Sequence, residues 1–398
     1  MAHRLDDRAP PARRRLLAAV AAALAVATVL GMVALRPTGE DRPDLTGLGF
    51  VAEVFSARVV TSSEEPCPGE TQEGVACRTV SFELDEGPDS GRIVSQQFVG
   101  AQGIPALDPG DEVILAFDAT AEEGFRYRFV DRQRTSTLLW LALVFAGAVV
   151  VLGRLRGLAA LAGLAASLLV LVWFVLPAIL DGRSAVLVAV VGAAAIAYLA
   201  LYLAHGFTLM TTVALLGTLA ALALTVVLAT VFVGVAELTG FASEEATAVQ
   251  VGAARIDLAG ILLGGVVIGA LGAIDDMTVT QASAVWELRA VSPLMSQRAL
   301  IRSGLRIGRD HVASTVNTLA LAYAGASLPV LLLLVLSRQS VATVLSGEVL
   351  ATEIVRTLVG SIGLVAAVPV TTWLAAMVAP SGSEPDRGPR LPAEEAGA

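Results

Sequence analysis

Eight apolar runs, each close to the length that crosses a bilayer, constrain the fold of this chain more than any other feature. They lie at 16–35, 138–153, 158–180, 185–204, 208–235, 258–274, 312–337 and 354–379. Hydrophobic residues make up 55% of the sequence, and a mean hydropathy of +0.73 is outside the range of soluble proteins. The sequence therefore predicts an α-helical integral membrane protein with about eight transmembrane helices.

The distribution of arginine predicts the orientation, because basic loops stay on the cytoplasmic side. Arginines at 13–15 precede the first run, so residues 1–15 are predicted to be cytoplasmic. The basic connections at 154–157 and 289–311 then fall inside. The acidic connections at 236–257 and 338–353 fall outside. We therefore expect a multi-pass protein of the bacterial cytoplasmic membrane with both termini cytoplasmic.

The two ends of the chain carry separate predictions. Run 16–35 is interpreted as an uncleaved first transmembrane helix, because it is longer than the apolar core of most signal peptides. A cleaved signal peptide is the alternative. Residues 137–379 are predicted to form a domain of seven further helices, and residues 380–398 a disordered cytoplasmic tail.

Residues 36–136 interrupt the apolar pattern with prolines, glycines and mixed charges. About five short segments alternate apolar and polar residues here, separated by turn sequences such as EGPDSG and DPGD. This pattern predicts a small extracytoplasmic all-β domain between the first two helices. An OB-like barrel is the first choice and an SH3-like barrel the alternative.

Cys67 and Cys77 are the only cysteines, and both lie in this predicted extracytoplasmic domain. An oxidising compartment favours a disulfide between them. Two free thiols are the alternative, and a zinc site would need histidine partners that this segment lacks.

The segment 258–289 passes from a glycine-rich apolar run into DDMTVTQASAVWEL. On a helix Asp276, Thr280, Ser283 and Glu287 share one face, whereas Asp275 lies about 100° away. The opposite side carries Val279, Ala282, Val285 and Trp286. We expect the polar face to point toward the protein interior and the apolar side toward lipid or a neighbouring helix, because intramembrane carboxylates usually mark a site.

Two interpretations of this segment stay open. The helix ends at the cytoplasmic surface near Asp275, where the carboxylates only solvate a helix end, or a half-buried or re-entrant helix continues over 275–289. The motifs GILLG and GVVIG before it have G-x-x-x-G spacing, which is typical of close helix packing.

A second polar face lies at the start of the run at 312–337. Asp310, Ser314 and Asn317 share it, beside a stripe of His311, Thr315 and Thr318. Asn317 is expected to need a partner on another helix. Interhelical packing alone is the alternative to an ion-binding role. Arginines at 298–309 form a basic face that is typical of contact with anionic headgroups.

Three segments, GALGAIDDMTVTQASAVWEL, IGRDHVASTVNTLALAYAGASLP and HGFTLMTTVALLGTLAAL, resemble the YibE/F-like family of bacterial multi-pass membrane proteins. The resemblance extends over nearly the whole chain. It implies a shared role for Asp276, Thr280, Ser283, Asn317 and Thr318. Some relatives carry methionine at the place of Asp275, so the resemblance favours Asp276. It implies an architecture and not a reaction.

The residues favour a transporter in which Asp276 with neutral oxygen ligands binds a proton or another cation. The alternative is an envelope scaffold or export-accessory protein that acts through its β domain. An intramembrane hydrolase is a third hypothesis, although adjacent carboxylates on a helix diverge and no hydrolase or phosphate-binding motif is present. We expect no enzyme activity, cofactor or nucleic-acid partner, and the lipid bilayer with an envelope protein or a second copy as partners. Whether a metal ion binds stays open.

Overall fold

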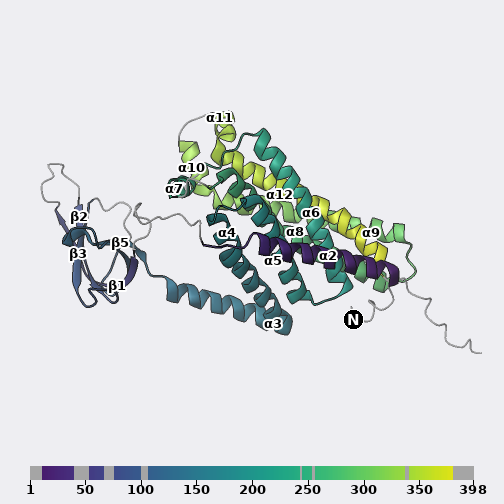
Figure 1. The fold of residues 1–398 in the computed structure, drawn as a ribbon, viewed down its shortest axis with the longest axis horizontal. Helices are drawn as coiled ribbons and strands as arrows, with labels where there is room; N and C mark the ends of the chain where they lie inside the picture. Colours follow the sequence, from purple (N-terminus) through teal and green to yellow (C-terminus); the bar gives the residue numbers. More distant parts are fainter. Residues whose placement is uncertain are drawn as a thin grey trace, which may run out of the picture. The chain divides into compact units, whose positions relative to one another are not determined.

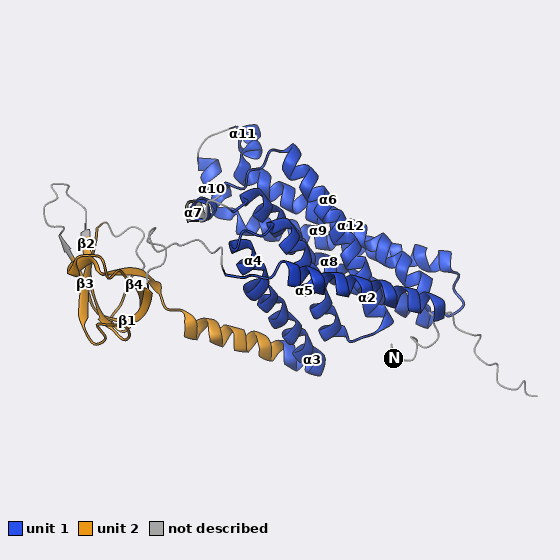
Figure 2. Cartoon of the chain, in the orientation of Figure 1, with its two compact units in different colours: residues 1–43, 149–398 blue, residues 44–148 orange. Residues whose placement is uncertain are grey.

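The structure is a computed structural model that describes residues 11–39, 53–66, 76–99, 106–242, 244–252, 256–336 and 340–379. Most of it is helical, with one small antiparallel sheet near the N-terminus. The chain divides into two compact units, one of residues 1–43 with 149–398 and one of residues 44–148 (Figure 2). The predicted tail at 380–398 lies outside the described residues.

The sheet in residues 44–148 is antiparallel and five-stranded, with the order β3-β2-β1-β4-β5 (Figure 1). Its strands are β1 (Glu53–Pro66), β2 (Ala76–Leu84), β3 (Ile93–Val99), β4 (Glu112–Phe117) and β5 (Tyr127–Arg132). The sheet curls, so that its two edge strands meet: the Phe129 N–H on β5 donates to Oε1 of Gln96 on β3 at 2.9 Å. The prediction of a small β domain in this segment is confirmed.

Alternation along the strands explains why the sheet encloses a core. In β4 Val113 and Leu115 are fully buried while Glu112 is exposed, as period-two side chains require. Phe82 packs on the same core and stacks on Phe129. The turn before β4 places Gly110 at φ +96°, a conformation that glycine adopts without steric cost.

The predicted disulfide stays a prediction. Cys77 is buried near the start of β2, whereas Cys67 lies outside the described residues.

The rest of the described chain is helical (Figure 1). The helices are α2 (Pro11–Ala34), α3 (Thr135–Val170), α4 (Leu176–Leu180), α5 (Ala185–His205), α6 (Leu209–Val235), α7 (Glu244–Gly252), α8 (Leu258–Val291), α9 (Gln297–Ala326), α10 (Leu328–Leu336), α11 (Val341–Ser346) and α12 (Glu348–Val378). A π-helical turn, Leu171–Val175, joins α3 to α4. Among the described residues, six helices are long and apolar enough to cross a membrane, or seven if α9 and α10, bent by 62°, count as one span.

Two predicted spans are not counted separately: the run at 312–337 falls on the bent pair α9 and α10, and two further runs fall in Thr135–Leu180, which counts as one helix of 46 residues. Its backbone breaks at Arg154, where φ is 52° and ψ is −130°. A Cβ added to Gly157 would lie 2.3 Å from the carbonyl oxygen of Val149. Residues eight apart on a straight helix are about 12 Å apart, so the chain folds back sharply here. The break falls between the predicted runs 138–153 and 158–180. The number of spans remains a prediction.

Candidate functional site

The predicted polar residues of the sixth apolar run lie on α8, which is one uninterrupted helix. Its 34 residues extend over about 50 Å, against a hydrocarbon core of about 30 Å. The helix therefore neither ends nor turns back at Asp275, and the apolar run 258–274 is only its first half. The interpretation that the helix ends near Asp275 is wrong, and so is a re-entrant turn there, whereas a half-buried helix over 275–289 agrees with the structure.

The predicted polar face of α8 is not the face that the bundle buries. Its members are exposed or half-buried: Asp276, Thr280, Ser283 and Glu287. Three residues of the opposite, apolar side are buried, which agrees with a neighbouring helix and not with lipid: Ala282, Val285 and Trp286. The helical period fixes which residues share a face, but neighbouring helices decide which face is covered. Here α6, α9 and α12 cover the side that holds Thr278 and Gln281.

Asp275 lies at the edge of this covered side. Its Oδ1 is buried and has no hydrogen-bond partner among the described residues. The hydroxyl of Thr218 on α6 lies beside this carboxylate, and its Oγ1 lies 2.7 Å from Oγ1 of Thr278. Thr218 donates to the carbonyl oxygen of Ala214 at 3.1 Å, and Thr278 donates to the carbonyl oxygen of Asp275 at 2.9 Å. Hydroxyls from two helices therefore lie next to a buried carboxylate oxygen.

Glycine–threonine contacts bring α6 and α12 close together. A Cβ added to Gly217 on α6 would lie 2.2 Å from Oγ1 of Thr371 on α12. A Cβ added to Gly363 on α12 would lie 2.1 Å from Oγ1 of Thr225 on α6. Both threonines are fully buried. Each helix therefore receives a threonine of the other against a glycine, as small residues permit in membrane bundles.

Gln281 ties α8 to α9 and α12. Its side chain is fully buried, and its Nε2 donates to the carbonyl oxygen of Gly304 at 2.8 Å and to Oγ1 of Thr372 at 2.6 Å. Its Oε1 has no partner within the described chain. A Cβ added to Gly308 would lie 2.8 Å from that Oε1, so only glycine lets α9 approach this closely.

Six buried side chains and the half-buried Asp275 form one feature, the polar seam, where α6, α8, α9 and α12 meet. Its members are Thr218, Thr225, Asp275, Thr278, Gln281, Thr371 and Thr372. Within the described residues no three His, Cys, Asp or Glu side chains are grouped to hold a metal ion. The seam offers one carboxylate, hydroxyls and an amide oxygen, which is the chemistry of intramembrane proton relays.

A second charged group lies near the N-terminal end of α12. Arg356 Nη1 donates to Oε1 of Glu353 at 2.7 Å, and its guanidinium lies 5.9 Å from the ring centroid of Tyr323 on α9. A Cβ added to Gly269 on α8 would lie 2.8 Å from the Tyr323 hydroxyl. This ion pair therefore lies beside the glycine-rich half of α8.

The polar face predicted on α9 is exposed on this chain. Asp310, His311, Ser314 and Asn317 all lie on its surface. No hydrogen bond recorded for the described residues joins Asp276 to Asp310 or Asn317. The hydroxyls of Thr315 and Thr318 bond to carbonyl oxygens of their own helix, 2.9 and 3.0 Å away. The partner expected for Asn317 is therefore not found, and the two predicted polar faces do not form one buried site.

Most members of the seam were missed in the sequence. The signal was present: Thr211, Thr218 and Thr225 recur every seven residues along α6 and are all buried. A heptad repeat of threonine keeps to one face of a helix. On α12 the pair Thr371 and Thr372 interrupts an apolar run and is likewise buried.

Comparison with known proteins agrees with this architecture. The family described as YibE/F-like protein matches residues 141–381, which is more than half of the chain and includes the whole polar seam. The β domain lies outside the matched residues. No curated protein and no solved structure matches the chain. The long apolar helices and this match together identify a multi-pass membrane protein of the YibE/F-like family, to which the chain belongs.

Proposed function

We propose that the protein is a proton- or cation-coupled transporter of the bacterial cytoplasmic membrane, and that Asp275 is the group that binds the ion. The observation that carries this proposal is the buried Oδ1 of Asp275, unpartnered among the described residues, beside the hydroxyl of Thr218. A buried carboxylate is costly unless it is paired or serves a function.

The surroundings of Asp275 suit an ion that binds and leaves. Its Oδ1 has no hydrogen-bond partner among the described residues, so this oxygen is available to a proton or a cation. The hydroxyls of Thr218 and Thr278 can reverse their donor directions as the charge on Asp275 changes. The glycine–threonine contacts between α6 and α12 leave few bulky side chains to hinder a relative movement of these helices.

The expected topology gives Asp275 a suitable depth. With both termini cytoplasmic and eight spans, α8 begins on the outer side at Leu258. Asp275 is then about 26 Å along the helix, in the inner part of the hydrocarbon core. A carboxylate at that depth exchanges protons with the cytoplasm and needs a polar route, such as the seam, toward the outside. Reporter fusions at Asp118 and after Ala398 test this topology.

A pair of adjacent variants tests the function. The full chain is reconstituted in vesicles with a pH-sensitive dye inside, and proton flux is followed under an imposed gradient. Asp275→Asn should abolish the flux, whereas Asp276→Asn, which removes an exposed charge next to it, should be much milder. The opposite ranking would favour the Asp276 site suggested by the sequence resemblance. Unchanged flux in both variants, at matched expression, would contradict the role of Asp275, and wild-type flux no faster than that of protein-free vesicles would contradict the transport proposal.

The alternative is a scaffold or export-accessory role of the β domain. Phe125 beside β5 is 76% exposed and Val99 at the end of β3 is 61% exposed, so both apolar side chains are accessible to a partner. The strand order, with β1 between β2 and β4, supports an OB-like barrel, a fold that often binds ligands. Deletion of residues 40–133 that leaves membrane insertion and ion flux intact but abolishes the cellular phenotype would favour this role.

A further inference from the structure

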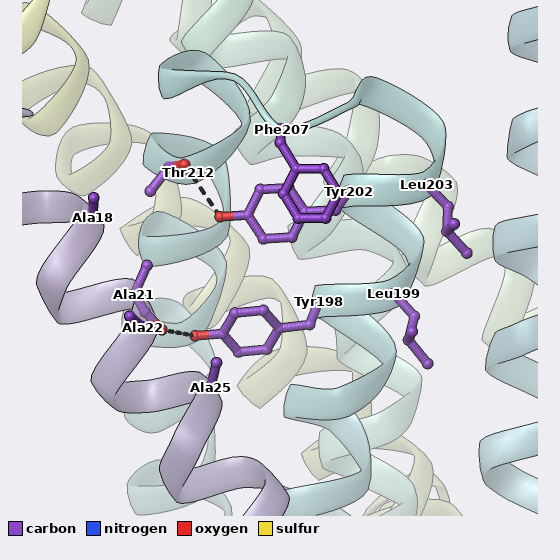
Figure 3. Close-up of a pocket in the computed structure, with 10 residues that line it drawn as sticks. All are labelled: Ala18, Ala21, Ala22, Ala25, Tyr198, Leu199, Tyr202, Leu203, Phe207 and Thr212. Carbon is purple, nitrogen blue, oxygen red and sulfur yellow. Dashed lines mark hydrogen bonds between the residues drawn. The ribbon is translucent and has the colours of Figure 1, made fainter.

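A groove between α2 and α5 lies apart from the polar seam. It has a volume of about 440 Å³ and is lined on one side by alanines of α2 and on the other by aromatic residues of α5 and the loop after it (Figure 3). The lining residues that matter here are Ala18, Ala22, Tyr198, Tyr202 and Phe207. This volume is typical of small-molecule sites. We propose that the groove binds one anionic phospholipid, with an acyl chain between the helices.

The walls of the groove suit an acyl chain. Small alanine side chains leave space along α2, while the ring of Tyr202 stacks on that of Phe207 with centroids 4.5 Å apart. Both tyrosine hydroxyls are already bonded: Tyr198 donates to the carbonyl oxygen of Ala21 at 2.7 Å, and Tyr202 lies 3.1 Å from Oγ1 of Thr212. Figure 3 shows both bonds. The groove therefore presents an apolar surface with its polar atoms satisfied.

The charge at one end of the groove identifies the headgroup. The two helices run antiparallel, because Gly31 contacts Val191 while Ala21 contacts Tyr198. His205 follows Tyr198 by seven residues, and Arg14 precedes Ala21 by seven, so both reach the same level. Helical spacing also places Arg15 on the groove face, three residues before Ala18.

Arg156 strengthens this basic end. It is exposed and lies within electrostatic reach of His205. No acidic residue lines the groove. Basic residues at a membrane surface attract anionic headgroups, and the predicted topology places this end at the cytoplasmic leaflet, where such lipids face positive loops. The apolar groove and its basic end together match the two parts of an anionic phospholipid.

Native mass spectrometry of the full chain tests the proposal, with phosphatidylglycerol and phosphatidylcholine of identical acyl chains as probes. Wild type should retain one phosphatidylglycerol in preference to phosphatidylcholine. Ala22→Trp, which fills the groove, should abolish this tight binding, whereas Ala23→Trp on another face of α2 should leave it unchanged. Arg15→Gln should lower the affinity for phosphatidylglycerol about fivefold, as expected for one basic residue near an anionic surface. Arg298→Gln on α9 is the matched charge control.

Each result decides for or against the site. Equal retention of both lipids would show that the groove holds ordinary bilayer lipid and would overturn the proposal. Unchanged binding in Ala22→Trp, with the same melting temperature as Ala23→Trp, would place the lipid elsewhere and overturn it as well. Ion flux is not part of this measurement, so its outcome is independent of the function proposed for Asp275.

Discussion

The hydroxyl oxygens of Thr218 and Thr278 lie 2.7 Å apart where α6 packs on α8. Both side chains are fully buried, and the Thr218 hydroxyl lies beside the carboxylate of Asp275. A threonine pair in such a place either fastens two helices together or supplies hydrogen bonds to a group whose charge changes. These two roles make different predictions for the same substitution, because valine keeps the shape of threonine and removes only its hydroxyl.

Thr218→Val should lower ion flux by about tenfold or more, because a hydrogen bond to a charged group contributes roughly 1.5–3 kcal/mol. The free energy of unfolding in detergent should fall by only about 1 kcal/mol, since interhelical hydrogen bonds in membranes are individually weak. Thr218→Ser keeps the hydroxyl and should retain flux. Equal flux in the valine and serine variants would assign Thr218 to packing alone.

Gln281 provides a test of the seam that does not depend on transport. Gln281→Leu removes the donor to Gly304 and Thr372 and should destabilise the bundle by about 1–3 kcal/mol, because buried acceptors lose their partner. The matched control is Gln297→Leu, at the exposed start of α9. Thermal unfolding of both variants in the same detergent measures the difference. A melting temperature equal to that of the control would show that Gln281 does not hold the three helices together.

The sequence predicts the polar face of α8 correctly as a set but not the direction in which it points. Spacing alone places Asp276, Thr280 and Ser283 on one face, and the structure keeps them together. Which face of α8 is buried depends on which neighbouring helices carry small residues where they contact it. These helices are distant from α8 in the sequence. Gly304 and Gly308 on α9 receive Gln281, and no local pattern in α8 reports that contact.

The helices and strands could be predicted from the sequence better than the contacts between them. Alternation identified the β strands, and the arginine-rich connection at 154–157 coincides with the backbone break at Arg154. A helix over 275–289 was one of the two interpretations that the sequence left open. Thr278 and Gln281 lie within the continuous helix, and the neighbouring helices supply hydrogen-bond partners for their side chains. Nothing in the local sequence of α8 identifies those partners.

The contact of Gly363 with Thr225 predicts a coupled pair of substitutions. Gly363→Ala should destabilise the protein by about 1–3 kcal/mol, as overpacking does in a tight core, because its Cβ would lie 2.1 Å from Oγ1 of Thr225. Adding Thr225→Ala removes that oxygen and should recover most of the loss. Gly272→Ala, which meets open space, is the control and should be neutral or slightly stabilising. Additive effects of the two substitutions would contradict direct contact.

Tyr127 predicts the response of the β domain to alkali. Its side chain is buried and its hydroxyl donates to Oδ2 of Asp89 at 2.9 Å. Burial, followed by the hydrogen bond to Asp89 and the charge of that carboxylate, raises the pKa of Tyr127 from 10.0 to about 12. In the unfolded chain the phenol loses its proton near its ordinary pKa. The stability due to neutral Tyr127 is therefore fully present below pH 10 and is lost as the pH rises toward about 12.

Phenolate absorbance of the full chain, compared between wild type and Tyr127→Phe, isolates the titration of this residue. The difference should show a midpoint near 12, and the β domain of Tyr127→Phe should lose less stability than wild type between pH 10 and that midpoint. Asp89→Asn removes the negative charge and should lower the midpoint without returning it to 10.0, because burial, the largest cause, remains. A wild-type midpoint near 10 would show that the hydroxyl of Tyr127 is in contact with solvent and that the bond to Asp89 does not form.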